Sequence, residues 1–282
     1  MSFPTFSRRS FFAGLSAAPV LLNAAGKKVP IGLELYSVRD MMKDDEAGTV
    51  KKVAALGYDC VEFYGPYFDW TTDQAKEMRK VLDGTGLKCH STHNGSANLK
   101  PENIKKAIEL NSIIGSKMVV MASSGLRAEE QKSLDGWKKV AETLSAADAT
   151  LKKSGMRAGY HNHGAEFHSI DGTLPVEVIA KNTPKSVVMQ LDVGTCVEAG
   201  QDPVAWIKRN PGRIRSIHLK EWSPDKGYEV LLGDGKAPWK AIFAAAESVG
   251  GIEFYLIEQE GYSTPSLEAS KVCLDNYKKL RA

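Results

Sequence analysis

Histidines and acidic residues stand at the ends of short apolar, β-branched runs along the 282-residue chain. Four of them end successive runs: His161, Asp192, His218 and Glu258. Imidazole nitrogens and carboxylate oxygens suit Mn²⁺, Zn²⁺, Co²⁺ or Fe²⁺ better than Ca²⁺, and two carboxylates neutralise a divalent ion. These residue types predict a site for one divalent metal ion, provided that the fold brings the four side chains together.

The elements that would position them are eight short β-prone runs, which alternate with amphipathic stretches of helical periodicity. The predicted strands are residues 31–36, 60–64, 87–91, 118–122, 157–161, 187–191, 215–219 and 254–257. The predicted helices include residues 47–56, 73–85, 101–114, 133–154 and 239–249. Eight alternating units predict an α/β fold in which a parallel sheet closes into a single (β/α)8 TIM barrel. An open doubly wound sheet is the alternative, but no G-x-G-x-x-G motif follows the first run.

A closed barrel brings the carboxyl ends of its strands to one rim, where active sites of this fold lie. Because alternate side chains face the barrel axis, the four candidate ligands share the phase that lets them converge. A single histidine or aspartate also has ordinary roles in a core or at a helix cap, but four in matching phase favour a metal site. His90, out of phase with His93, is expected to face the surrounding helices, and His168 to lie on the surface.

Short motifs occur in a fixed order along the chain. They are residues 32–40 (GLELYSVRD), 57–58 (GY), 61–62 (VE), 159–163 (GYHNH), 166–167 (EF), 191–195 (LDVGT), 217–220 (IHLK), 233–235 (GDG) and 257–260 (IEQE). With these motifs, residues 30–280 resemble the sugar phosphate isomerase/epimerase branch of the xylose isomerase-like TIM barrel superfamily. The resemblance implies a metal held by a carboxylate on the fifth strand, Asp on the sixth, His on the seventh and Glu on the eighth.

Asp192, His218 and Glu258 match the last three of these ligands, whereas His161 stands where ketose epimerases have Glu. In those epimerases the two Glu ligands also act as the acid and base, so their symmetric mechanism does not carry over directly. The Tyr-His-Asn-His form resembles instead a branch that includes inosose dehydratase-like proteins. Similar proteins often have Gln where this chain has Glu34.

The implied activity is a metal-dependent sugar isomerase or epimerase that acts through an enediolate on a carbonyl-bearing sugar or sugar derivative. A lyase or dehydratase acting on a keto-glycoside or inosose would use the same site. A non-catalytic sugar-binding barrel is a third hypothesis. A nuclease resembling endonuclease IV is disfavoured, because it needs three metals and more His and Glu ligands than the chain offers.

Other polar and aromatic residues at the predicted rim suit the reaction. Glu258 is the first candidate for the base, and Lys220 and His163 are the next candidates for proton transfer. The candidate substrate-binding residues are Glu34, Tyr36, Arg39, Glu62, His93 and Trp222. Phe63 and Tyr64 would either join an aromatic wall for a sugar ring or pack in the barrel. The long irregular stretch over residues 221–238 follows the seventh strand and is predicted to carry function.

The first 26 residues are predicted to be a twin-arginine (Tat) export signal, and residues 27–282 the barrel domain. Arg8 and Arg9 precede an apolar stretch over residues 11–25 that ends in small residues. Such a signal implies a periplasmic or secreted protein and the Tat export machinery as a partner. A flexible extension or a core helix is the alternative, and the run is too short for a stable membrane span. A periplasmic address favours a sugar without phosphate.

The overall composition is that of an ordinary globular chain, with 43% hydrophobic and 25% charged residues. A formal net charge of +3 opposes non-specific binding of nucleic acid. The chain has four cysteines and no C-x-x-C pair, so a zinc ribbon is not expected. We expect the cysteines to be buried free thiols.

Overall fold

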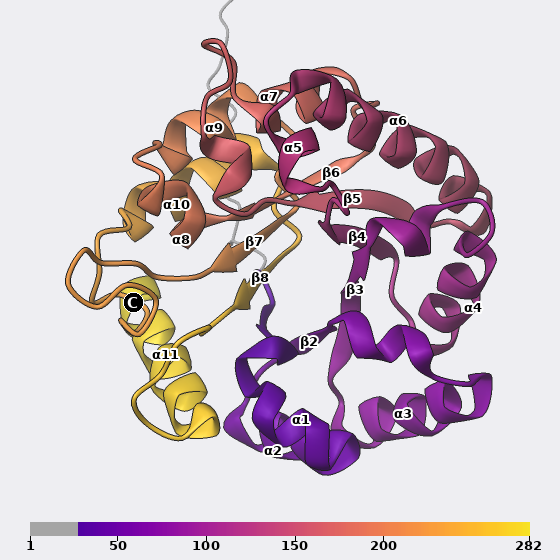
Figure 1. Ribbon diagram of the computed structural model, residues 1–282. Coiled ribbons are helices and arrows are strands. Elements are labelled where there is room, and N and C mark those ends of the chain that lie inside the picture. Colours follow the sequence, from indigo (N-terminus) through magenta and orange to yellow (C-terminus); the bar gives the residue numbers. More distant parts are fainter. Residues whose placement is uncertain (1–27) are drawn as a thin grey trace, which may run out of the picture.

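Within residues 28–282, which the computed structural model describes, eight parallel strands close into a barrel in the order of the sequence (Figure 1). The strands are β1 (Ile31–Glu34), β2 (Cys60–Phe63), β3 (Lys88–Gly95), β4 (Met118–Ser123), β5 (Arg157–His161), β6 (Val188–Asp192), β7 (Ser216–Leu219) and β8 (Phe254–Ile257). The predicted (β/α)8 TIM barrel is confirmed. The predicted export signal lies outside the described residues.

Helices form the outer layer of the barrel. They are α1 (Arg39–Asp44), α2 (Glu46–Leu56), α3 (Thr72–Thr85), α4 (Ile104–Ile114), α5 (Ala128–Gln131), α6 (Leu134–Leu151), α7 (Pro175–Lys181), α8 (Val193–Glu198), α9 (Pro203–Arg209), α10 (Trp239–Ala245) and α11 (Ser266–Arg281). Short turns complete the connections: η1 (Leu35–Val38), η2 (Gly65–Asp69), η3 (Ser96–Leu99), η4 (Lys152–Ser154), η5 (Ala165–Phe167) and the π-helical η6 (Ala246–Gly250). Among the described residues, no helix combines the length and apolar character needed to cross a membrane.

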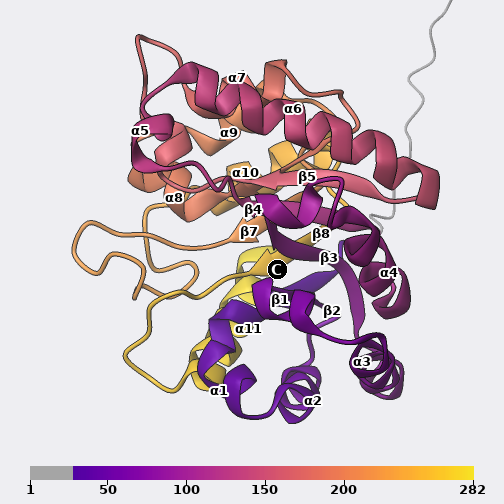
Figure 2. The ribbon, with the colours of Figure 1, turned by 45° about the vertical axis from the view of Figure 1, so that its right-hand side comes forward.

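Local sequence explains where a helix such as α3 begins and ends. Thr71 and Gln74 form a capping box at its start, and Gly86 ends it in the left-handed conformation with a φ of 80°. Its buried residues are Ala75, Met78 and Leu82, which recur at helical spacing and so form one apolar face. The longer helix α6 packs along strand β5 (Figure 2).

Alternation along the strands separates two apolar layers. Side chains such as Leu33, Val61 and Ile217 belong to the large core between the strands and the helices. A smaller buried cluster consists of Cys60, Met118, Val120, Val188, Phe254 and Leu256. Two residues beyond Cys60, Val188 and Leu256, the same strands carry Glu62, Gln190 and Glu258, because side chains repeat every second residue. The apolar interior therefore supports a polar layer at the carboxyl ends of the strands.

The phase of β3 differs from the sequence prediction. Cys89 pairs with Val61 and Ser91 with Glu62, so the register shifts and His90 is an extra residue in the strand. The expectation that His90 faces the helices is wrong, since its ring lies 5.0 Å from that of Phe254, within the smaller apolar cluster. The bulge also lets His93 reach the polar layer. The first strand is shorter than predicted because the chain turns into η1 after Glu34.

Gly32 in β1 fits only because it has no side chain. A Cβ there would lie 2.6 Å from Cys60 Sγ and 2.8 Å from Leu256 Cδ2. We expect Gly32→Ala to lower the free energy of unfolding by about 1–3 kcal/mol, because it overpacks the barrel interior. Chemical denaturation would measure the change.

Gly84→Ala in α3 is the matched control. A Cβ at this position meets nothing within 4 Å. Because Ala is the better helix former, the control should raise stability by about 0.5–1 kcal/mol. Equal effects of the two substitutions would contradict the packing explanation.

Candidate metal centre

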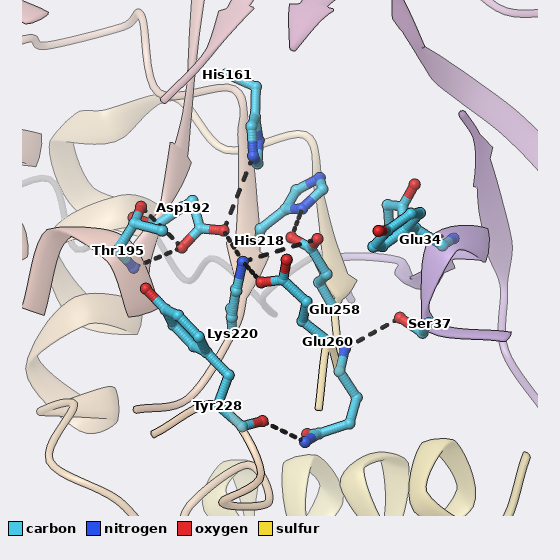
Figure 3. Close-up of polar contacts among 12 residues, drawn as sticks. Glu34, Ser37, His161, Asp192, Thr195, His218, Lys220, Tyr228, Glu258 and Glu260 are labelled. Carbon is cyan, nitrogen blue, oxygen red and sulfur yellow. Dashed lines mark hydrogen bonds and ion pairs between the residues drawn. The ribbon is translucent and has the colours of Figure 1, made fainter. Parts of the chain in front are cut away.

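The carboxyl ends of β5 to β8 bring the four predicted metal ligands together. Each of His161, Asp192, His218 and Glu258 offers one ligand atom, and these atoms all lie within 4.8 Å of one another (Figure 3). Asp192 and His218 are direct neighbours in the pairing of β6 with β7. All four side chains are buried. Their convergence is geometric, and their assignment as ligands stays a prediction.

Asp192 presents one carboxylate oxygen that lacks a hydrogen-bond partner. Its Oδ1 accepts bonds from the backbone N–H of Thr195 at 2.8 Å and from the Thr195 hydroxyl at 3.2 Å, which caps α8. Its Oδ2 is buried and accepts no hydrogen bond. Burial raises the pKa of Asp192, because a buried charge needs a compensating cation. A metal ion at Oδ2 would satisfy this atom.

His161 presents a free ring nitrogen to the same point. Its Nδ1 lies 3.0 Å from Gln190 Oε1, and its Nε2 lies 3.8 Å from Asp192 Oδ2. Burial and the neighbouring ring of His218 lower the pKa of His161 well below its ordinary value. The imidazole is therefore uncharged at neutral pH, which is the form that binds a metal.

His218 bridges two carboxylates. Its Nδ1 lies 2.8 Å from Glu258 Oε2, and its Nε2 lies 2.7 Å from Glu62 Oε2. Burial disfavours the charged ring, but Glu62 and Glu258 prevail and raise the pKa of His218 to about 10. A carboxylate behind a ligating histidine fixes its ring orientation in many metal sites.

Glu62 was predicted to contact substrate, but the structure places it beneath the histidines. It does not line the cavity and is fully buried. It also receives a bond from Gln190 Nε2 at 3.0 Å and lies 3.1 Å from His93 Nε2. Burial opposes its charge, yet His93 and His218 lower the pKa of Glu62 to about 2. Its geometry is that of an orienting carboxylate.

Lys220 lies among three carboxylates. Its Nζ is 3.5 Å from Asp192 Oδ2 and 3.9 Å from Glu258 Oε1, and it forms an ion pair with Glu260. The ring of Tyr228 covers it at 4.6 Å. Burial opposes the charge, but these acidic neighbours raise the pKa of Lys220 well above its ordinary value. Lys220 therefore stays protonated and is unsuited to act as a base.

The acidic groups around Lys220 exceed its single charge. Lys220 and protonated His218 together face four carboxylates, those of Glu62, Asp192, Glu258 and the partly exposed Glu260, so negative charge remains in excess. Together with the Asp192 Oδ2 that accepts no hydrogen bond, this excess fits a divalent ion held by two imidazoles and two carboxylates. The donor set does not select among Mn²⁺, Zn²⁺, Co²⁺ and Fe²⁺.

A cavity of about 270 Å³ opens above this cluster. Its lining residues are Glu34, Tyr36, Tyr64, Gly65, His93, Asn94, Gly95, Ala122, Ser123, His161, His163, Glu258 and Glu260. Of the predicted substrate-binding residues, Glu34, Tyr36 and His93 line it, and so does His163. Tyr64 packs edge-on against Tyr36 with ring centroids 5.4 Å apart, whereas Phe63 is buried in the core.

Arg39 and Trp222 do not line the cavity. The guanidinium of Arg39 donates to the backbone carbonyls of Tyr36 and Glu260, each at 3.0 Å, so it joins the loops after β1 and β8. Trp222 is the second residue of the loop over residues 221–238. The buried carboxylate of Glu221 organises this loop. That carboxylate accepts bonds from the backbone N–H groups of Gly233 at 2.9 Å and Ala237 at 3.1 Å.

Sequence reasoning assigned no role to Gln190 or Glu260. Gln190 joins β6 to its neighbours, because it contacts His93, His161, Glu62 and Ser216. Both residues lie two positions from a predicted ligand on the same strand, Gln190 before Asp192 and Glu260 after Glu258. This two-residue spacing places both side chains on the same face as the ligands, and it could have identified them from the sequence.

A sequence profile of the family described as xylose isomerase-like TIM barrel matches residues 50–277. This chain belongs to that family. The resemblance inferred from the motifs is therefore confirmed at the level of the xylose isomerase-like barrel.

Relatives of this xylose isomerase-like barrel include proteins named inosose dehydratase. The one from Clostridium perfringens strain ATCC 13124 is 25% identical over 176 residues, and the match spans 52% of this chain and 59% of that protein. The one from Clostridium beijerinckii is 24% identical over 267 residues, spanning 82% and 88%. A crystal structure of a sugar phosphate isomerase/epimerase from Parabacteroides distasonis is 27% identical, with a TM-score of 0.75 over 89% of this chain and 94% of that one.

Asp192→Asn tests the ligand assignment, because it retains the Oδ1 cap of α8 and removes the carboxylate charge. We expect the wild-type protein to hold about one divalent ion per chain and the variant to lose it on dialysis. Glu62→Gln should weaken metal affinity about 10–100-fold through the orientation of His218. Elemental analysis and metal titration would measure both effects. The exposed His168→Ala is the control, and its loss of metal in parallel would contradict the site.

Metal binding should also release a proton. In the metal-free protein His218 is protonated at neutral pH, since its pKa is raised to about 10. A metal at Nδ1 requires an uncharged ring, so each ion bound at about pH 8 should release close to one proton, and release should fade above the pKa. Calorimetric titration in buffers of different ionisation enthalpy measures this. Binding without proton release would exclude His218 Nδ1 as a ligand.

Proposed function

We propose that the protein is a divalent-metal-dependent enzyme that removes the proton next to the carbonyl of a sugar or cyclitol, as an isomerase or epimerase. The observation that carries this proposal is the Asp192 Oδ2 that accepts no hydrogen bond, within a buried His/Asp/Glu cluster at the edge of a cavity. Family membership supports it, because relatives named for sugar isomerisation and inosose dehydration share the barrel.

His161, Asp192, His218 and Glu258 would hold the ion. When bound, a divalent ion supplies Lewis acidity that polarises a carbonyl and favours loss of the adjacent proton. Glu62 and Gln190 would keep the rings of His218 and His161 in the orientation that ligation needs.

Glu258 is the first candidate for the base. It lines the cavity, and although burial opposes its charge, Lys220 and His218 hold the pKa of Glu258 well below its ordinary value. It is therefore a carboxylate at neutral pH, the form that accepts a proton, although its low pKa makes it a weak base. His163 is the second candidate, because it lines the cavity and is exposed. Returning the proton to the neighbouring carbon isomerises the sugar, and returning it to the opposite face epimerises it.

The charges of the cavity support a neutral substrate. Among the described residues that line it, Glu34, Glu258 and Glu260 are acidic and none is Lys or Arg. Phosphate groups are usually bound by Arg, Lys or a metal, so a sugar phosphate would lack its usual partners away from the metal. A volume of about 270 Å³ also suits one sugar ring better than a larger ligand.

A dehydratase acting on an inosose or keto-glycoside is the second candidate. His161 in place of a carboxylate removes the symmetric acid/base pair, which favours a reaction with distinct acid and base. Relatives named inosose dehydratase support the same choice. Both reactions begin with the same proton removal.

We further propose that residues 1–26 are a twin-arginine export signal and that residues 27–282 act in the periplasm or outside the cell. Arg8, Arg9 and the apolar stretch that follows them support this proposal. Export would favour a substrate without phosphate, in agreement with the acidic cavity.

Exchange of the proton next to the carbonyl tests the proposed function. Metal-loaded protein in D₂O is expected to exchange this proton in keto-sugars or inososes, and Glu258→Gln to slow exchange by about 10²–10⁴-fold. Proton NMR measures the rate, with exposed Glu268→Gln on α11 as the control. Binding of these compounds without exchange would instead favour the sugar-binding barrel.

A further inference from the structure

Glu34 is a buried acid whose free oxygen belongs to the wall of the cavity. It is the last residue of β1, is fully buried and lines the cavity. Its Oε2 accepts a hydrogen bond from the backbone N–H of Tyr36 at 2.6 Å, as the cap of η1. Its Oε1 has no hydrogen-bond partner in the described chain, and His93 Nδ1 remains 3.9 Å away. One oxygen is therefore anchored while the other is unused.

The neighbouring strands place like charges on both sides of Glu34. In the pairing of β1 with β2, Glu34 is opposite Glu62. In the pairing with β8, Leu33 is opposite Ile257, so Glu258 lies at the level of Glu34 (Figure 3). Both of those carboxylates bond to His218, whereas Glu34 does not.

The other titratable groups around Glu34 do not pair with its free oxygen, so the excess of negative charge around it remains. His93 from β3 keeps its Nδ1 3.9 Å from Oε1 and directs its Nε2 to Glu62 at 3.1 Å, so it pairs with that carboxylate and not with Glu34. His218 from β7 is shared by two other carboxylates. Burial and then Glu258 raise the pKa of Glu34 well above its ordinary value, in agreement with the geometry. In the metal-free chain, two acidic neighbours and the lack of a paired cation favour the protonated form of this carboxyl group.

We propose that Glu34 is the acid of this site: its Oε1–H donates a proton to an oxygen that leaves the carbon β to the substrate carbonyl. This inference rests on the proposed function and deepens it, because it assigns the site to elimination. The substrate class is then a neutral keto-sugar or ketocyclitol with a β-hydroxyl group.

The step balances without an oxidant or reductant. The base takes the proton next to the carbonyl, and the C–H electron pair moves toward the carbonyl oxygen. When a carbon–carbon double bond forms, the bond from the β-carbon to oxygen breaks and its electrons leave with the oxygen. The proton from Glu34 converts that oxygen to water. A proton returned from the base through solvent restores Glu34, and the net change is loss of one water.

Other residues of the site are less suited to this role. Lys220 is held by Asp192 and Glu260 and does not line the cavity. Glu258 is bonded to His218 at 2.8 Å and belongs to the candidate metal ligands, so its carboxylate is already engaged. Glu34 differs from both in that it lines the cavity and keeps its Oε1 free of any hydrogen-bond partner in the described chain.

Glu34→Gln tests the proposal, because Gln preserves the size and the oxygen that accepts from Tyr36 N–H but has no proton to transfer. The experiment uses the metal-loaded full chain with an inosose as the probe. Proton exchange in D₂O and formation of the dehydrated product are measured separately. We expect dehydration to fall by about 10²–10⁴-fold while exchange stays near the wild-type rate. Metal content and thermal unfolding verify that the variant is intact.

Infrared spectroscopy gives a second readout that does not depend on turnover. The wild-type protein at neutral pH is expected to show the band of a protonated carboxyl group that Glu34→Gln lacks, with and without metal. Glu268→Gln, on the exposed face of α11, should leave the band unchanged.

The outcomes separate the two proposals. Wild-type exchange with no dehydration would overturn the role of Glu34 and leave the proposed function intact. Equal losses of exchange and dehydration in Glu34→Gln would overturn the role of Glu34 as the acid and favour a role in substrate binding. An unchanged dehydration rate in this variant would also overturn the role as the acid. An absent infrared band would show that Glu34 is ionised and so cannot be the acid. A wild-type protein that neither exchanges nor dehydrates would overturn both proposals.

Discussion

The organisation of the site depends on the imidazole of His218, which lies between the carboxylates of Glu62 and Glu258. This bridge crosses the barrel from β7 to β2 and also joins β7 to its neighbour β8. It balances two buried negative charges with one ring, and it leaves Asp192 and Glu34 without that ring as a partner. The oxygen left free on Asp192 suits a cation, and the one left free on Glu34 suits a proton. The division of roles in the site therefore follows from which acids the histidine reaches.

The apolar interior of the barrel offsets the free-energy cost of burying this network of carboxylates and imidazoles. Beneath the polar layer, residues such as Val188 and Leu256 pack without polar atoms, and Gly32 allows β1 to approach β2 and β8. The buried carboxylates gain their hydrogen bonds from strands that this interior holds in register. The apolar cluster thus supports the polar layer at the carboxyl ends of the strands, where active sites of this fold lie.

Much of the fold and part of the site could be predicted from the sequence. The eight strands follow from periodicity, and the convergence of His161 and Asp192 from strand phase, because both depend on local patterns. Glu62 could not be placed, since its burial beneath His218 depends on contacts across the barrel. His90 was misplaced because a bulge changes the phase without changing the composition of β3. Arg39 binds two backbone carbonyls, which no side-chain pattern reveals.

The buried carboxylate of Glu221 fastens the far end of the loop over residues 221–238 to its beginning. The segment between these anchor points still contacts the candidate site, because the ring of Tyr228 covers Lys220. Insertions or exchanges near Pro224 and Asp225, which are exposed, leave the anchors in place. The exposed tip of this loop can therefore vary in sequence while Glu221 holds its two ends together.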